Sequence, residues 1–151
     1  MKILIMGLPG SGKTTLAEPF AKLMGGIHIN ADATRKKYDD WDFSIEGRMR
    51  QANRMRHLAD GVVLAGKVAI ADFVCPTEQA RSSFDPDFTV WMDTIKEGRF
   101  EDTNKVFENP PRCDYHVNTW FDNTPEILAL VVERYIAIAA GQTFDGSIQH
   151  V

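Results

Sequence analysis

The residue types best suited to chemistry stand near the start of the chain, where Gly7-Leu-Pro-Gly-Ser-Gly-Lys-Thr14 fills every position of the G-x-x-x-x-G-K-[ST] phosphate-binding loop. Its glycines permit backbone conformations that a Cβ would obstruct, so successive N–H groups can converge on a polyphosphate. Lys13 adds a cation over the β- and γ-phosphates, and the Thr14 hydroxyl can ligate Mg²⁺. We therefore predict a site for ATP and Mg²⁺, whose nucleotide-binding residues are Gly7, Leu8, Pro9, Gly10, Ser11, Gly12, Lys13, Thr14 and Thr15.

A carboxylate near the end of a second apolar run completes the expected metal site. Residues 67–74 are apolar and rich in β-forming residues, which predicts a central parallel strand. Asp72 falls near the end of this strand, where the acidic residue of a Walker B strand stands when it holds the magnesium shell. Thr14 and Asp72 are therefore the predicted metal ligands.

Strand and helix patterns alternate along the chain after the phosphate-binding loop. Right-handed crossovers turn this order into a P-loop NTPase-type three-layer α/β/α fold around a doubly wound, parallel, five-stranded sheet. Residues 95–111 lack apolar periodicity and predict a long, mobile, lid-like loop, and residues 142–151 predict a C-terminal tail. The expected strands are 1–6, 27–30, 67–74, 88–92 and 115–118, and the expected helices are 15–24, 34–38, 45–65, 76–84 and 127–140.

Length and composition indicate one globular domain over residues 1–151. The net charge of −4 argues against a broad electrostatic surface for nucleic acid. The 2 cysteines are too few for a disulfide framework or a zinc site, and no run is long enough to cross a membrane, so we expect a cytoplasmic protein. Apolar residues of the last helix, including Val131, Ile136 and Ile138, leave open a choice between core packing and a homodimer interface.

Two groups of polar residues follow the strands and have more than one interpretation. Asp32 stands just past the end of the expected strand 27–30, where ligands bind in parallel α/β sheets, but it could instead cap the next helix. Arginines crowd the early turns of the helix 45–65, where the helix dipole would prefer acidic groups. Either they form a solvated basic face, or at least one binds a phosphate or sulfate group; they are Arg48, Arg50, Arg54 and Arg56.

Three further segments resemble the adenylylsulfate (APS) kinase family. Residues 29–35 are similar to the family's D-G-D-x-x-R segment, residues 42–44 to its G-F-S, and residues 73–76 to its F-x-S-P, in the right order along the chain. The resemblance implies a kinase that uses ATP and Mg²⁺ to phosphorylate the 3′-hydroxyl of adenosine 5′-phosphosulfate. It would place the protein in sulfate assimilation.

The resemblance also implies roles for individual residues. Asp32 would orient or deprotonate the acceptor hydroxyl, Arg35 and Arg48 would grip the phosphosulfate, and Phe43 would stack on the acceptor's adenine. Arg99 is our choice for a lid arginine that closes over the transferring group. The implied catalytic residues are Lys13, Asp32 and Arg99, and the implied substrate-binding residues are Asp32, Arg35, Phe43, Arg48, Gln51, Phe73, Val74 and Cys75.

Departures from the family pattern keep other functions open. Asn30 replaces the first aspartate of D-G-D, Cys75 replaces the serine of F-x-S-P, and the segment 95–111 is much shorter than the family's lid. Asp72 could restore the charge lost at Asn30. The alternatives are a kinase for another small acceptor, such as a nucleoside monophosphate, a sugar acid or a nucleic-acid end, and a nucleotide-binding protein with little catalysis.

Overall fold

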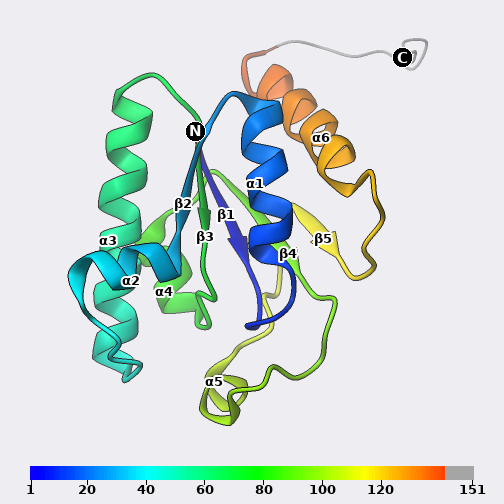
Figure 1. Ribbon diagram of the computed structural model, residues 1–151. Coiled ribbons are helices and arrows are strands. Elements are labelled where there is room, and N and C mark those ends of the chain that lie inside the picture. The colour runs from blue at the N-terminus through cyan, green and yellow to red at the C-terminus, as the bar shows by residue number, and fades with distance from the viewer. Residues whose placement is uncertain (142–151) are drawn as a thin grey trace.

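Five parallel strands form one sheet in the order β2-β3-β1-β4-β5 (Figure 1). The computed structural model describes residues 1–141, so the predicted tail at 142–151 lies outside the described residues. All neighbouring strands pair in parallel, which confirms the predicted P-loop NTPase-type α/β/α class. The strands are β1 Lys2–Met6, β2 Ile27–Asn30, β3 Ala69–Asp72, β4 Phe88–Met92 and β5 Tyr115–Val117.

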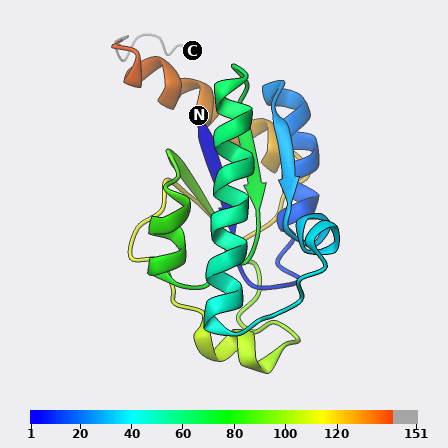
Figure 2. The same ribbon diagram turned by 90° about the vertical axis from the view of Figure 1, so that its left-hand side faces the viewer.

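Helices cover both faces of this sheet because its inner strands are apolar on both sides. Alternate residues of β1 enter different cores: Ile3 and Ile5 pack with α1 and α6, whereas Leu4 and Met6 pack with α3 and α4. Figure 2 shows α3 and α4 on the side of the sheet that faces the viewer. The helices are α1 Lys13–Met24, α2 Ala31–Tyr38, α3 Ile45–Leu64, α4 Glu78–Phe84, α5 Glu101–Val106 and α6 Thr124–Ala139.

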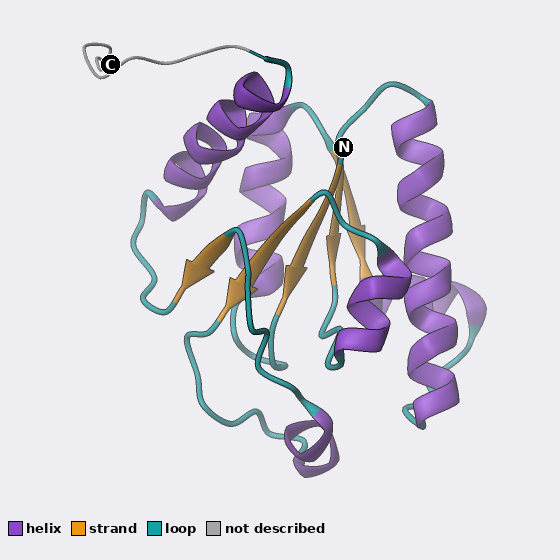
Figure 3. Ribbon diagram, turned by 180° about the vertical axis from the view of Figure 1, so that it is seen from behind, coloured by secondary structure: helices purple, strands orange, loops and turns teal. Residues whose placement is uncertain are grey.

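The carboxyl ends of the strands all point toward the same edge, where the phosphate-binding loop leaves β1. Figure 3 shows α5 beyond this edge, within the segment that connects β4 to β5. The sequence predicted a long, lid-like loop over 95–111, and the structure places the short helix α5 within that segment. Any group held at the strand ends therefore lies between the phosphate-binding loop and α5.

The starts of α3 and α2 are fixed by side-chain caps. Ser44 caps α3 immediately before the expected first residue of this helix, 45, since its hydroxyl oxygen accepts a hydrogen bond from the Gly47 N–H at 3.1 Å. The cap of α2 is Asn30, which accepts from the Ala33 N–H at 2.9 Å, so the alternative role of Asp32 as a cap is wrong. Asp32 instead lies in the first turn of α2, with its side chain free for another task.

The last helix has one buried and one exposed apolar side. Val131 packs against the core, whereas Ile136 and Ile138 are exposed. Core packing therefore accounts for Val131, and only the exposed side of the helix is available for a homodimer interface. A homodimer interface remains a prediction. Among the described residues, no helix is both long enough and apolar enough to span a bilayer.

Candidate active site

A cavity of about 750 Å³ opens at the carboxyl edge of the sheet. Its walls come from the phosphate-binding loop, the start of α2, the segment before α3, the end of β3 and the region around α5. The cavity brings together most of the residues that the sequence singled out. Those lining it are Pro9, Gly10, Gly12, Lys13, Thr14, Thr15, Asp32, Phe43, Arg48, Asp72, Phe73, Val74 and Arg99.

The backbone of the phosphate-binding loop depends on glycine at its first position. A Cβ on Gly7 would lie 2.4 Å from the Met92 carbonyl oxygen, so no larger residue fits between β1 and β4. Gly12, with φ of 94°, leads directly into α1. The Thr94 hydroxyl donates a hydrogen bond to the Ser11 carbonyl at 2.8 Å, which fixes the loop to the end of β4. The loop thus presents α1's N-terminus to the cavity.

Lys13 points back across this loop. Its ammonium donates a hydrogen bond to the Leu8 carbonyl at 3.1 Å. Burial lowers the pKa of Lys13 from its ordinary 10.5 to about 8, although the negative charges of Asp72 and Asp32 oppose the shift. A bound polyphosphate would supply the negative charge that this buried cation lacks.

Asp72 is a buried carboxylate at the end of β3, with three polar neighbours. The Thr14 hydroxyl lies 3.2 and 3.4 Å from its two oxygens, and the Asn30 amide donates to Oδ2 at 3.2 Å. His28 Nε2 lies 2.5 Å from the same Oδ2. His28 was not predicted from the sequence, although the alternation of β2 places it on the same side as Asn30.

The donors at this point suit a hard cation. The described residues contain no group of three or more His, Cys, Asp or Glu side chains that could hold a metal ion. Magnesium in nucleotide sites needs few protein ligands, because phosphate oxygens and water complete its octahedron. The Thr14 hydroxyl and the Asp72 carboxylate are both oxygen donors and lie together at the cavity wall, so these residues fit Mg²⁺ bound with a nucleotide.

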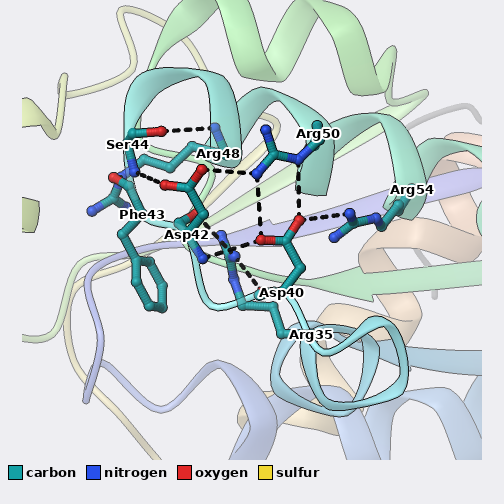
Figure 4. Close-up of polar contacts among 9 residues, drawn as sticks. Arg35, Asp40, Asp42, Phe43, Ser44, Arg48, Arg50 and Arg54 are labelled. Carbon is teal, nitrogen blue, oxygen red and sulfur yellow. Dashed lines mark hydrogen bonds and ion pairs between the residues drawn. The ribbon is translucent and has the colours of Figure 1, made fainter.

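The arginines near the start of α3 are largely used to hold the segment 39–44 (Figure 4). Arg54 pairs with Asp40 at 2.6 Å, and Arg50 pairs with both Asp40 and Asp42. These hydrogen bonds, first from Arg50 and then from Arg54, hold the pKa of the Asp40 carboxyl well below its usual range. Arg50 and Arg54 therefore form neither an unpaired basic face nor part of the cavity wall.

Arg35 and Arg48, the two arginines expected at an acceptor anion, have different surroundings. Arg35 is buried, donates to the carbonyls of Asp40 and Asp42 at 2.9 and 3.2 Å, and does not line the cavity. Arg48 lines the cavity, and its Nη2 donates to the Thr103 hydroxyl of α5 at 3.0 Å. Both guanidinium groups lie near the Phe43 ring, at 4.3 and 5.4 Å from its centroid. The structure thus leaves Arg48, and not Arg35, facing the cavity.

Gln51 and Cys75 were predicted to bind substrate, but the structure places both behind the cavity wall. Gln51 is buried and donates to the Ala31 carbonyl at 3.0 Å, which joins α3 to the start of α2. Cys75 is buried, and burial raises the pKa of its thiol far above the ordinary value. Neither side chain lines the cavity. Both side chains therefore lie behind the wall and support it, and neither is exposed on its inner surface.

The segment between β4 and β5 closes one side of the cavity. Arg99 lines it as expected, and its guanidinium lies 5.2 Å from the Phe100 ring. Two further aromatic rings of the wall, Trp41 and Phe100, were not predicted; both are partly exposed, and both lie in segments whose loop structure gives no periodic signal. The wall away from the phosphate-binding loop therefore combines aromatic rings with two arginines, Arg48 and Arg99, and two carboxylates, Asp32 and Asp102.

The parallel sheet, the phosphate-binding loop and the position of Lys13 and Thr14 define the class as a P-loop nucleotide-binding fold. A family model described as an AAA domain, AAA_33, matches residues 3–89, which include the loop and the strands β1 to β3. The chain belongs to this family of P-loop domains. No curated protein matches the sequence at a significant level.

Solved structures with the same fold include kinases for several different acceptors. The APS kinase CysC from Mycobacterium tuberculosis, in complex with AMPPNP and APS, has a TM-score of 0.70 at 16% identity, over 87% of this chain and 96% of that chain. Shikimate kinase from Aquifex aeolicus has a TM-score of 0.65 at 14% identity, over 90% and 98%. A gluconokinase from Sinorhizobium meliloti 1021 has a TM-score of 0.57 at 16% identity, over 93% of each chain. At these identities the similarity shows a kinase-type fold alone.

Proposed function

We propose that this chain is an ATP-dependent kinase that phosphorylates the 3′-hydroxyl of adenosine 5′-phosphosulfate or a closely related nucleotide. The observation that carries the proposal is one cavity lined both by the phosphate-binding loop and by Asp32, Phe43 and Arg48. The loop end suits the triphosphate of ATP. Phe43 and Arg48 suit a planar, anionic acceptor, since a ring can stack on a base and a guanidinium can pair with phosphate or sulfate. The complex of the M. tuberculosis kinase with AMPPNP and APS supports this pairing of substrates.

The residues have distinct tasks in the proposed reaction. The acceptor oxygen attacks the γ-phosphorus, the bond to the β–γ bridging oxygen breaks, and ADP leaves with that oxygen. Asp32 takes the proton of the acceptor hydroxyl, while Lys13 and Arg99 lie against the charge that spreads over the phosphoryl oxygens. Thr14 and Asp72 would hold Mg²⁺, which neutralises charge on the β- and γ-phosphates when bound.

A kinase for another small acceptor is the second candidate, and the position of Arg35 favours it. In the APS kinase resemblance two arginines grip the phosphosulfate, whereas here Arg35 is engaged with backbone carbonyls and only Arg48 of the pair lines the cavity. A single arginine in the cavity suits an acceptor with one anionic group, such as a nucleoside monophosphate. This candidate shares the donor site and differs in the acceptor alone.

Acceptor-dependent ADP release tests the proposal. Purified protein is given ATP and Mg²⁺ with adenosine 5′-phosphosulfate, AMP, gluconate, shikimate or an oligonucleotide, and each rate is compared with the rate without acceptor. Release that depends on adenosine 5′-phosphosulfate supports the first candidate, and release with a different acceptor supports the second. Nucleotide binding without acceptor-dependent release with any of them would refute the kinase proposal.

A variant of Arg48 locates the acceptor within the cavity. Arg48→Ala removes the guanidinium that would pair with the acceptor's anion, so we expect KM for the acceptor to rise by about tenfold or more, the equivalent of about 1.5 kcal/mol or more for a charged hydrogen bond. The affinity for ATP should change little. Arg112→Ala, an exposed arginine outside the cavity, is the matched control and should leave both constants unchanged.

A further inference from the structure

His28 stands at the metal site without any role in the function proposed above. It lies on β2, and the register with β3 pairs His28 with Ile70 and Asn30 with Asp72. Because side chains of one strand alternate between faces, His28 and Asn30 project on the same side. Both contact the Oδ2 atom of Asp72, at 2.5 Å from the imidazole Nε2 and 3.2 Å from the amide nitrogen.

The two oxygens of Asp72 are used unequally as a result. Oδ2 receives the imidazole, the amide and, at 3.2 Å, the Thr14 hydroxyl, whereas the one hydrogen-bond contact of Oδ1 among the described residues is the same hydroxyl at 3.4 Å. An ionised carboxylate can only accept, so a hydrogen bond between His28 and ionised Asp72 requires the tautomer that carries its hydrogen on Nε2. Because all three donors lie nearest to Oδ2, the remaining acceptor capacity of the carboxylate is concentrated on Oδ1.

We propose that His28 is a positioning residue, which fixes the Asp72 carboxylate so that its less occupied oxygen serves the Mg²⁺ of a bound nucleotide. The proposal rests on the Mg²⁺–ATP site of the proposed function and assigns His28 no contact with substrate. Partners of metal-binding carboxylates typically act through orientation, and their loss weakens metal affinity about 10- to 100-fold. The short contact and the shared oxygen are what distinguish His28 from a histidine that merely fills space.

The same contact would exist if His28 only satisfied a buried carboxylate, since such a group is costly to leave without donors. That simpler role predicts a loss of stability but no change in how Mg²⁺ and nucleotide bind together. The positioning role predicts that the joint binding of Mg²⁺ and nucleotide is weakened. The ratio of nucleotide affinity with Mg²⁺ to nucleotide affinity in EDTA separates the two, because it measures the metal and does not depend on turnover.

The experiment measures binding of the non-hydrolysable analogue AMPPNP by titration calorimetry, with Mg²⁺ and with EDTA. His28→Phe keeps a ring but removes the donor, whereas His28→Gln keeps an N–H near the position of Nε2. His57→Phe, a change at an exposed histidine of α3, is the matched control. We expect His28→Phe to lower the Mg²⁺ enhancement of AMPPNP affinity by about tenfold, His28→Gln to restore most of it, and His57→Phe to match the wild type.

Two results would overturn the proposal. One is an unchanged Mg²⁺ enhancement in His28→Phe, whatever happens to its thermal stability, and the other is an equal loss in His57→Phe. The function and this inference can fail separately: a protein that shows the expected binding pattern but phosphorylates no acceptor contradicts the kinase proposal and supports the role of His28. A wild type whose AMPPNP affinity does not respond to Mg²⁺ contradicts the positioning role.

Discussion

Replacing Lys13 should make the unliganded protein more stable while it destroys nucleotide binding. Lys13 is the cation of the phosphate-binding loop, and the folded chain leaves it half-buried with one hydrogen bond, to the Leu8 carbonyl. Burial lowers the pKa of Lys13 from 10.5 to about 8, despite the opposing charges of Asp72 and Asp32. The folded state therefore disfavours the protonated lysine at neutral pH, a cost that a nucleotide would offset. Lys13→Met keeps the length of the side chain and removes the charge.

The size of the effect follows from the difference in pKa between the unfolded and folded chains. At 1.36 kcal/mol per pH unit, protonated Lys13 lowers the free energy of unfolding at pH 7 by about 3 kcal/mol. The variant recovers this energy but loses the hydrogen bond to Leu8, about 1 kcal/mol, so its net gain is about 2 kcal/mol. Between pH 8 and 10.5 the unfolded chain holds a proton that the folded chain has released, so wild-type stability rises there relative to the variant. From pH 7 to about pH 9.5 the gap should narrow by about 2 kcal/mol.

Urea denaturation of wild type and Lys13→Met at several pH values measures this gap directly. Taking the difference between the two proteins cancels the titration of every group that they share. AMPPNP titration of the same samples should show that the variant no longer binds. Suppose that the two proteins have the same free energy of unfolding at pH 7, or that their difference stays constant up to pH 9.5. Either result would refute the claim that loss of solvation destabilises protonated Lys13 in the folded state.

Two further predictions concern packing behind the walls of the cavity. A Cβ on Gly47 would lie 2.1 Å from the Asp42 carbonyl oxygen, so Gly47→Ala should lower the free energy of unfolding by about 1–3 kcal/mol. Gly61 is in the same helix, and a Cβ there would meet no neighbouring group within 4 Å, so Gly61→Ala should raise the free energy of unfolding by about 0.5–1 kcal/mol. Equal shifts of the urea midpoint in the two variants would contradict this packing argument. Arg81 is buried and donates hydrogen bonds to the carbonyls of Cys75, Pro76 and Glu108. Arg81→Met should therefore lower the free energy of unfolding, measured by thermal denaturation, by about 2–4 kcal/mol and raise KM for the acceptor. Arg112→Met, at an exposed arginine, should change the free energy of unfolding by less than about 0.5 kcal/mol.

The elements that follow local rules could be predicted from the sequence. The strand at 2–6 is apolar from Ile3 to Met6 because helices cover both of its sides, and the loop after it has a pattern set by its backbone. Ser44 predicted the start of α3 because a hydroxyl at that position can accept the N–H of a residue three positions ahead. These signals lie within a few residues of one another, so they require no knowledge of the fold.

The parts that depend on contacts between distant segments could not be predicted. The helix Glu101–Val106 is too short to show a period, and its position is fixed by contacts such as the hydrogen bond from Arg48 to Thr103. Arg35 follows a strand end just as a ligand-binding residue would, yet two backbone carbonyls occupy it. The contact of His28 with Asp72 can be recognised only when the pairing of β2 with β3 is known. Sequence patterns identify the residue types, whereas pairing and packing decide which atoms each one meets.

The pairing of Asn30 with Asp72 bears on how distant relatives of this chain should be recognised. The two residues are partners across adjacent strands, and their side chains meet at the same point. An acidic group can therefore move from one strand to the other during evolution while its place in space stays the same. A pattern written along a single segment would count such a chain as lacking the carboxylate. A template of positions in space, independent of chain order, would find it.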